Sequence, residues 1–190
     1  MYQTLLAKLG QILESSGIPY MIIGGQAVLL NGEPRLTRAI DITLGLDASE
    51  LNKVRDAVGR IGLRPVGEDL ETFVRDTNVL PVADPASGVR VDLIFSFTPY
   101  ESEAIRRAVG VVFDDVTVRF DSVEDLIVHK LVAGRARDIE DVSGILARNP
   151  SIDKAYLIRW LASFRDIVHR DPLEEFHALV RRLDSARGSR

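Results

Sequence analysis

The sequence contains no cysteine and no apolar run of about 18 residues or more. The absence of cysteine excludes disulfide bonds, thiolate metal sites and a cysteine nucleophile. The absence of a long apolar run excludes a membrane-spanning helix, and the N-terminus Met1-Tyr2-Gln3-Thr4 lacks the basic and apolar regions of a secretory signal. We therefore expect a cytoplasmic protein that does not contact a membrane.

The chain has no net positive charge and few aromatic side chains. The formal net charge is −4 and aromatic residues make up 6% of the 190 residues, which argues against a general basic coat for nucleic acid. The charge is uneven, because residues 148–190 carry nine Lys or Arg against six Asp or Glu, whereas residues 1–147 carry 15 against 22. The basic end fits the docking of a polyanion, and the alternative is a solvated helix surface.

Apolar periodicity predicts an α/β front of about 120 residues and a helical back of about 70 residues. The predicted strands are residues 20–23, 40–46, 63–66, 72–79, 89–95, 111–113 and 116–120. Ser122 has the chemistry of a helix cap, and four helices are expected after it. We therefore divide the chain into an α/β core, residues 1–121, and a C-terminal helical region, residues 122–190.

Two aspartates lie inside predicted strands. Asp41 and Asp92 each sit among aliphatic and β-branched residues, where an ionised carboxylate is costly unless it is paired or binds a cation. If the two strands were adjacent and both side chains faced one way, they would form a hard-oxygen site suited to Mg²⁺. The alternative for each aspartate alone is an ordinary strand residue that faces solvent.

A double glycine separates the first predicted strand from a helix. Gly24-Gly25 would let the backbone approach a ligand closely, and the N-terminus of the following helix favours an anion such as a triphosphate. The alternative for a lone Gly-Gly pair is a structural turn. The pattern becomes specific as a set: the glycines, then Arg35-Leu36-Thr37, then two strands that each contain an aspartate.

This set of motifs resembles the signature of DNA-polymerase-β-like nucleotidyltransferases, in the branch of minimal AbiEii and MenT toxins. The resemblance rests on Ile23–Ala27, Pro34–Asp41, Val91–Ile94 and the helical segments with His129-Lys130-Leu131 and Arg135–Asp141. It covers residues 18–147 and implies a mixed sheet flanked by helices, of the nucleotidyltransferase type, with a C-terminal helical bundle. It also implies transfer of a nucleotide from an NTP to a hydroxyl group.

The resemblance assigns roles to individual residues. Asp41 and Asp92, with a third carboxylate at position 39, would hold two Mg²⁺ ions, and Lys130 would reach the triphosphate as a point charge. The residues assigned to nucleotide binding are Gly24, Gly25, Gln26, Arg35, Thr37, Arg38, Lys130 and Asp138. The alternatives are structural pairing for Arg35 and a surface position for Lys130, while Asp138 would orient Lys130 or Arg135 and Asp141 would cap or pair.

The sequence departs from the family pattern at two positions. Gln26 stands where many relatives have Ser or Thr, and Ala39 stands where the first aspartate of Asp-x-Asp is expected. Alanine cannot bind a metal, so activity should be reduced or abolished. Because the surrounding motif is intact, we interpret Ala39 as an engineered aspartate-to-alanine substitution; the alternative is a natural pseudoenzyme that binds nucleotide without turnover.

The acceptor that we prefer from the sequence is RNA, and in particular the 3′ end of tRNA, as for MenT-type toxins. The basic C-terminal segment supports this interpretation, whereas the scarcity of aromatic residues for base stacking weighs against it. The alternatives are AMPylation of a protein, a small-molecule acceptor such as an aminoglycoside, and a catalytically dead nucleotide-binding regulator. A toxin would also have a cognate antitoxin as its partner.

Overall fold

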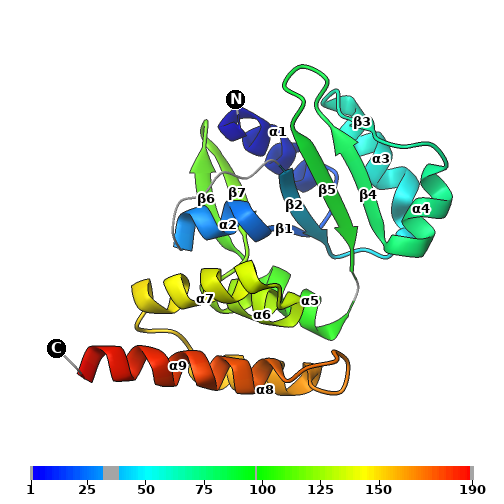
Figure 1. The fold of residues 1–190 in the computed structure, drawn as a ribbon. Coiled ribbons are helices and arrows are strands. Elements are labelled where there is room, and N and C mark those ends of the chain that lie inside the picture. The colour runs from blue at the N-terminus through cyan, green and yellow to red at the C-terminus, as the bar shows by residue number, and fades with distance from the viewer. Residues whose placement is uncertain (1, 32–38, 97, 189–190) are drawn as a thin grey trace. The chain divides into compact units, whose positions relative to one another are not determined.

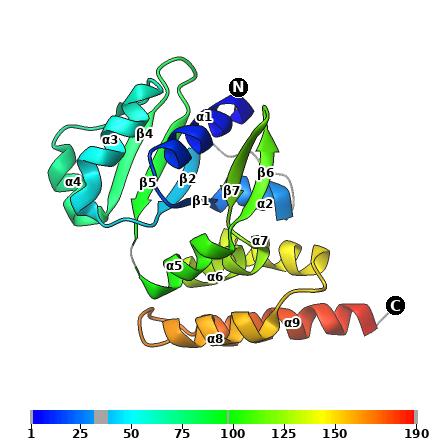
Figure 2. The same cartoon turned by 180° about the vertical axis from the view of Figure 1, so that it is seen from behind.

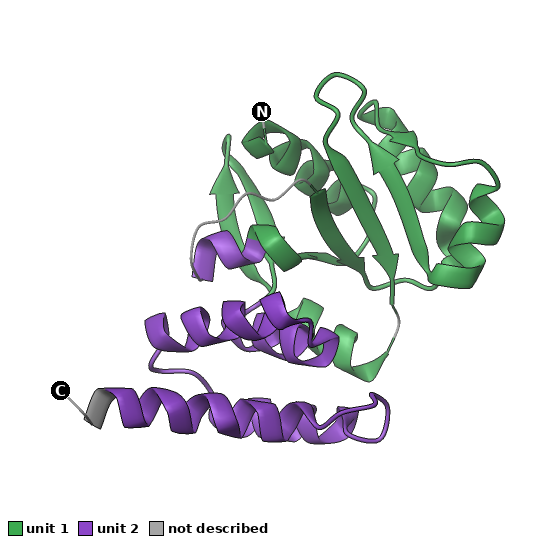
Figure 3. Ribbon diagram, viewed as in Figure 1, with its two compact units in different colours: residues 1–26, 36–121 green, residues 27–35, 122–190 purple. Residues whose placement is uncertain are grey.

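The structure, a computed structural model, describes residues 2–31, 39–96 and 98–188 (Figure 1). Contacts within the chain define two compact units, Met1–Gln26 with Leu36–Asp121, and Ala27–Arg35 with Ser122–Arg190 (Figure 3). The first unit holds the β-sheet and the second is helical in its described part. The expected fold class, a mixed sheet flanked by helices with a helical C-terminal region, is confirmed.

Seven strands of the first unit form one sheet in the order β3-β4-β5-β2-β1-β7-β6. The pairs β2–β5 and β1–β7 are parallel and the other neighbouring pairs are antiparallel, so the sheet is mixed. The strands are β1 (Tyr20–Ile23), β2 (Ala39–Leu44), β3 (Arg64–Pro65), β4 (Val79–Ala83), β5 (Arg90–Phe95), β6 (Val109–Phe113) and β7 (Val116–Phe120).

The two central strands alternate between a buried face and a more exposed face. Ile40, Ile42 and Leu44 of β2, like Val91 and Leu93 of β5, are fully buried on one face. Each such side chain contributes about 1.5–3 kcal/mol of hydrophobic stabilisation. Because side chains alternate along a strand, the residues between them point to the opposite face, and this face carries both aspartates.

Helices α1 (Tyr2–Ser15) and α3 (Leu51–Arg60) lie next to each other and contribute buried apolar side chains to the core of the first unit (Figure 2). Both show the apolar spacing of an amphipathic helix. The unit also contains a short 3₁₀ helix (Ala48–Glu50), capped by Asp47, and α5 (Pro99–Arg107), capped by Thr98. Helix α2 (Gly24–Asn31) follows β1 directly.

The prediction of a strand over residues 72–79 was wrong, because helix α4 (Leu70–Thr77) occupies most of that segment. The aromatic and β-branched residues Phe73 and Val74 favour a strand by propensity. The structure instead satisfies helix-end signals: the Asp69 side chain accepts a hydrogen bond from the Thr72 amide, and Asn78 ends the helix in the left-handed conformation, at φ 56°. Strand β4 begins only after this turn.

The two rims of the sheet differ. Strand β3 at one rim has two residues and includes Pro65, whereas β6 at the other rim has five residues, of which Val109 and Val112 are 53% and 66% exposed. Next to β3, the amide of Val66 donates a hydrogen bond to the carbonyl of Pro81 at 2.9 Å. The ladder ends there because Pro81 has no N–H to return the bond.

The helical unit contains four helices after Ser122: α6 (Val123–Ala133), α7 (Ala136–Arg148), α8 (Lys154–Phe164) and α9 (Pro172–Gly188). Helix α6 is capped by Ser122 and ends at Gly134 in the left-handed conformation. Fully buried side chains such as Leu126, Ile145 and Leu157 form the core. The described end of α2 joins this unit, since Asn149 donates a hydrogen bond to the Asn31 carbonyl at 3.0 Å.

A buried polar network links α6 to α8. Asp125 is fully buried, and its two carboxylate oxygens accept hydrogen bonds of 2.6 Å from the hydroxyls of Tyr156 and Ser122. Glu124 accepts a further hydrogen bond of 3.0 Å from the Asp153 amide, which begins α8. These bonds fix the register of α8 against α6, because a buried carboxylate without partners would be strongly destabilising.

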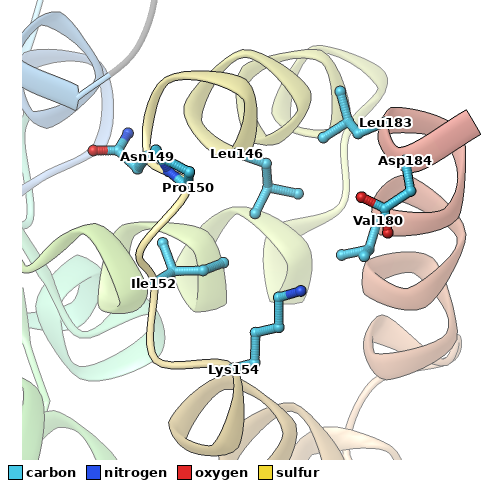
Figure 4. Close-up of a pocket in the computed structure, with 8 residues that line it drawn as sticks. All are labelled: Leu146, Asn149, Pro150, Ile152, Lys154, Val180, Leu183 and Asp184. Carbon is cyan, nitrogen blue, oxygen red and sulfur yellow. The ribbon is translucent and has the colours of Figure 1, made fainter. Parts of the chain in front are cut away.

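A hollow of about 40 Å³ lies beside the α7–α8 connection and α9 (Figure 4). Its wall is mainly aliphatic and includes Leu146, Ile152 and Val180, with Lys154 and Asp184 also lining it. This volume suits water rather than a nucleotide. Within residues 2–31, 39–96 and 98–188, no helix has the length and apolar character needed to cross a membrane.

Candidate active site

The turn between β1 and α2 places a glycine directly against Asp41. Gly24 has φ +68°, a conformation that L side chains rarely adopt. A Cβ atom added there would lie 2.5 Å from the Oδ2 atom of Asp41, closer than real contacts allow. Both the backbone angle and the neighbouring carboxylate therefore favour glycine at position 24.

The structure brings Asp41 and Asp92 together. The parallel pairing of β2 with β5 places the two residues directly opposite each other, and Ile23 of β1 lies opposite Asp41 on the other side. Neighbouring strands are about 4.8 Å apart, and residues in register point to the same face. The two carboxylates thus lie side by side, next to the turn that begins with Gly24.

Arg90 lies beside the two aspartates, and it was not identified as a site residue from the sequence. Its Nε atom lies 2.8 Å from the Oδ1 atom of Asp92, and both side chains are partly exposed, at 52% and 21%. Such a pair contributes little stability, about 0–1 kcal/mol, but it restrains the orientation of the Asp92 carboxylate. The available signal was the spacing, because residues 90 and 92 share one strand face.

Ala39 occupies the third corner of this group. It lies two residues before Asp41 on the same face of β2, opposite Arg90 of β5. A methyl group supplies no oxygen, and within the described part of the chain no group of three or more His, Asp or Glu side chains could hold a metal ion. An aspartate at position 39 would share a face with Asp41.

Of four other residues that the sequence assigned to nucleotide binding, the structure describes one. Gln26 lies in the first turn of α2 with its side chain buried, at 7% exposure. Arg35, Thr37 and Arg38 lie outside the described residues. The structure therefore describes the glycine turn and the two carboxylates, and the contribution of the segment between them stays a prediction.

Lys130 of the helical unit lies between two carboxylates. Its Nζ atom donates a hydrogen bond of 2.8 Å to Oδ1 of Asp138 and lies 2.8 Å from Oδ2 of Asp141. The lysine is 6% exposed, so the ammonium is balanced by buried negative charge. The Oδ2 atom of Asp138 accepts a hydrogen bond of 3.3 Å from the Arg135 amide, where α7 begins.

The arginines of the helical unit are partly neutralised by their own neighbours. Arg165 pairs with Asp171 at 2.7 Å, and Arg181 pairs with Glu174 at 2.7 Å. Arg159 lies over the ring of Trp160, with its guanidinium carbon 5.2 Å from the ring centroid. These contacts engage guanidinium groups that a phosphate-binding track along the C-terminal segment would need.

The sheet, the glycine turn and the paired aspartates together define a nucleotidyltransferase fold, and comparisons with known proteins agree. The model of the family described as nucleotidyl transferase AbiEii toxin, type IV toxin–antitoxin system, matches residues 19–188. The chain belongs to this family, which confirms the resemblance found in the sequence. A search among curated proteins found no match.

Solved structures are similar to the chain in fold. The antibiotic-resistance factor ANT(2″)-Ia in solution is 18% identical, with a TM-score of 0.56 over 97% of each chain. The same protein in complex with adenylyl-2″-tobramycin is 19% identical, with a TM-score of 0.56 over 87% of this chain and 97% of that chain. An antigenic nucleotidyltransferase-like protein from Paracoccidioides brasiliensis is 18% identical, with a TM-score of 0.54 over 86% and 87% of the two chains.

Proposed function

We propose that the site at Gly24, Asp41 and Asp92 binds an NTP with Mg²⁺ and transfers the nucleotide to a hydroxyl group of an RNA. The proposed acceptor is the hydroxyl at the 3′ end of tRNA. The observation that carries the proposal is the in-register pair Asp41 and Asp92 beside the glycine turn. Two carboxylates on one face fit Mg²⁺, which is usually bound through one or two carboxylates together with substrate phosphates. Membership of the AbiEii toxin family supports the reaction class.

Each residue of the site has a physical task in this proposal. The amides at Gly24 and Gly25 begin helix α2, where backbone N–H groups and the helix dipole favour a triphosphate. Asp41 and Asp92 would hold Mg²⁺, which shields phosphate charge and lowers the pKa of the attacking hydroxyl when it is bound. Arg90 holds the Asp92 carboxylate in place through the 2.8 Å ion pair.

The proposed reaction is in-line transfer at the α-phosphorus. The acceptor oxygen forms a bond to the α-phosphorus, the bond from that phosphorus to the bridging oxygen of the β-phosphate breaks, and pyrophosphate leaves. The acceptor hydroxyl loses its proton to solvent. Because such chemistry depends on positioning and on neutralised charge, the in-register placement of Asp41 and Asp92 on one sheet face is the protein's main contribution.

Ala39 is treated in this proposal as a substitution that weakens the site while leaving nucleotide binding in place. The methyl group stands on the face that carries Asp41, so restoring a carboxylate there would complete a set of three. The second candidate, a nucleotide-binding regulator with a native alanine, is favoured by the same observation. A cognate antitoxin is the partner expected for a toxin of this family.

Restoring the carboxylate tests the proposal. The Ala39→Asp variant is incubated with Mg²⁺, each labelled NTP in turn, and total tRNA, bulk protein or tobramycin as acceptor. Label on tRNA that the unmodified chain does not produce supports the proposal, and loss of that label in Ala39→Asp/Asp92→Asn ties it to the site. Label on protein or on tobramycin contradicts the RNA acceptor. A folded variant that binds MgNTP but labels nothing supports the regulator.

A further inference from the structure

A hollow of about 440 Å³ adjoins the carboxylate pair within the first unit. Its lining includes the apolar side chains of Val66, Phe73 and Pro81 and the charged side chains of Glu68, Asp69 and Arg90. Val66 and Phe73 are 44% and 45% exposed. The volume lies within the range of small-molecule sites, about 300–1,000 Å³, which are mostly apolar with a few polar groups.

The hollow neighbours the site, because two of its lining residues, Pro81 and Arg90, lie next to Asp92. Pro81 lies directly opposite Asp92 in the β4–β5 pairing, so both side chains point to the same face. Arg90 lines the hollow and also holds Asp92 through the 2.8 Å ion pair. Ile23, Asp41, Asp92 and Pro81 therefore form one row across four neighbouring strands.

The local sequence explains why an opening exists at this point. Pro81 cannot donate a backbone hydrogen bond, so the β3–β4 ladder stops after the single bond from Val66, and the chain leaves the sheet. It then enters α4 at Asp69 and exposes Phe73 one turn later. The exposed ring of Phe73 therefore lies near the point where the β3–β4 ladder ends.

The charges at the two ends of the row differ. The glycine turn offers backbone N–H groups to an anion, whereas the lining of the hollow includes the carboxylates of Glu68 and Asp69. Among the lining residues that the structure describes, the one cation is Arg90, which is paired with Asp92. Three strand spacings, about 14 Å, separate the two ends. A triphosphate is favoured at the glycine end and disfavoured at the hollow, where the exposed apolar side chains of Val66 and Phe73 suit an uncharged apolar group.

We infer that this hollow holds a nucleobase at the end of the acceptor RNA, stacked on the ring of Phe73, while the adjoining ribose presents its hydroxyl to the site beside Asp92. The inference rests on the proposed function, because it assigns a binding position to the acceptor of that reaction. A base has an uncharged aromatic face, and stacking on an aromatic side chain tolerates any base. The phosphates of the RNA lie outside the hollow, away from the carboxylates of Glu68 and Asp69.

Stacking can be measured with the chain as it stands, without catalysis. The probe is the trinucleotide CCA in which 2-aminopurine replaces adenine, because stacking quenches the fluorescence of this base. We expect saturable quenching that Phe73→Ala abolishes, with binding weakened roughly 5- to 150-fold, as stacking on one side chain contributes about 1–3 kcal/mol. Phe73→Tyr keeps the ring and should keep the quenching, and Val112→Ala, at the other rim, is the control for loss of an exposed apolar group.

The outcomes separate the inference from the proposed function. In Ala39→Asp, Phe73→Ala should raise the KM for tRNA about as much as it weakens the trinucleotide, with the KM for NTP unchanged. If tRNA is labelled but neither its KM nor the quenching responds to Phe73→Ala, the hollow is not the base site and the proposed function stands. If no RNA is labelled or bound, both fail. Tobramycin binding that depends on Phe73, without trinucleotide binding, assigns the hollow to a cationic small molecule and overturns the inference.

Discussion

Replacing Gly24 by alanine should weaken nucleotide binding, while its cost in stability should equal that of the same change at a glycine outside the site. The new Cβ atom would lie 2.5 Å from Oδ2 of Asp41, whereas real Cβ contacts are longer than about 3 Å. The carboxylate, being the end of a side chain, can rotate away by about half an ångström or more. The backbone angle of φ +68° adds about 1–2 kcal/mol of strain for any residue with a Cβ atom.

Gly17→Ala is the matched control for this prediction. Gly17 has nearly the same backbone angle, φ +60°, but a Cβ atom there meets nothing within 4 Å. Both variants should therefore lose about 1–2 kcal/mol of unfolding free energy in urea, followed by circular dichroism. Only Gly24→Ala should also weaken MgNTP binding, by roughly ten- to hundredfold, because displacement of a site group by a fraction of an ångström to one ångström has that effect.

Calorimetric titration of the two variants with each NTP and Mg²⁺ measures this difference in binding. If Gly24→Ala binds nucleotide as well as Gly17→Ala does, the contact between Gly24 and Asp41 has no part in the site. If Gly24→Ala is instead much less stable than Gly17→Ala, Asp41 is held too firmly to rotate, and the account of a mobile carboxylate is wrong. Either result would be visible in the same two variants.

Two further predictions concern the buried polar groups of the helical unit. Tyr156→Phe removes a 2.6 Å hydrogen bond to the buried Asp125, which should lower the unfolding free energy in urea by about 1.5–3 kcal/mol; an unchanged midpoint would show that the bond contributes nothing. Lys130→Met leaves Asp138 and Asp141 without their shared cation and should cost about 3–5 kcal/mol, more than Asp138→Asn, which keeps one carboxylate on the lysine. If Lys130→Met and Asp138→Asn lowered the unfolding free energy equally, in thermal or urea unfolding, the assignment of Lys130 as the shared partner of both aspartates would be wrong.

The alternation of apolar residues was enough to predict the two strands that carry the aspartates. Ile40 and Ile42 occupy one face of β2, and this pattern fixes the opposite face for Asp41. Alternation alone does not determine which strands are neighbours, so the in-register pairing of Asp41 with Asp92 required the structure. The resemblance to a known family supplied the expectation that the two would meet.

Other features depend on contacts that no short pattern contains. Phe73 and Val74 have strand propensity, but the caps at Asp69 and Asn78 determine a helix, and a proline at position 81 opens the sheet beside it. The burial of Lys130 between two carboxylates follows from the packing of α6 against α7, which sequence spacing does not give. The division of the chain into an α/β core, residues 1–121, and a C-terminal helical region, residues 122–190, stays a prediction.

The unequal rims of the sheet have a consequence for the behaviour of the protein in concentrated solution. A strand from another molecule can extend a sheet only where a row of backbone donors and acceptors is accessible. The β3 rim offers two residues, one of them proline, whereas β6 presents five residues with exposed valines. Of these two rims, β6 is the one at which chains would pair edge to edge, so aggregation during expression or storage should begin there.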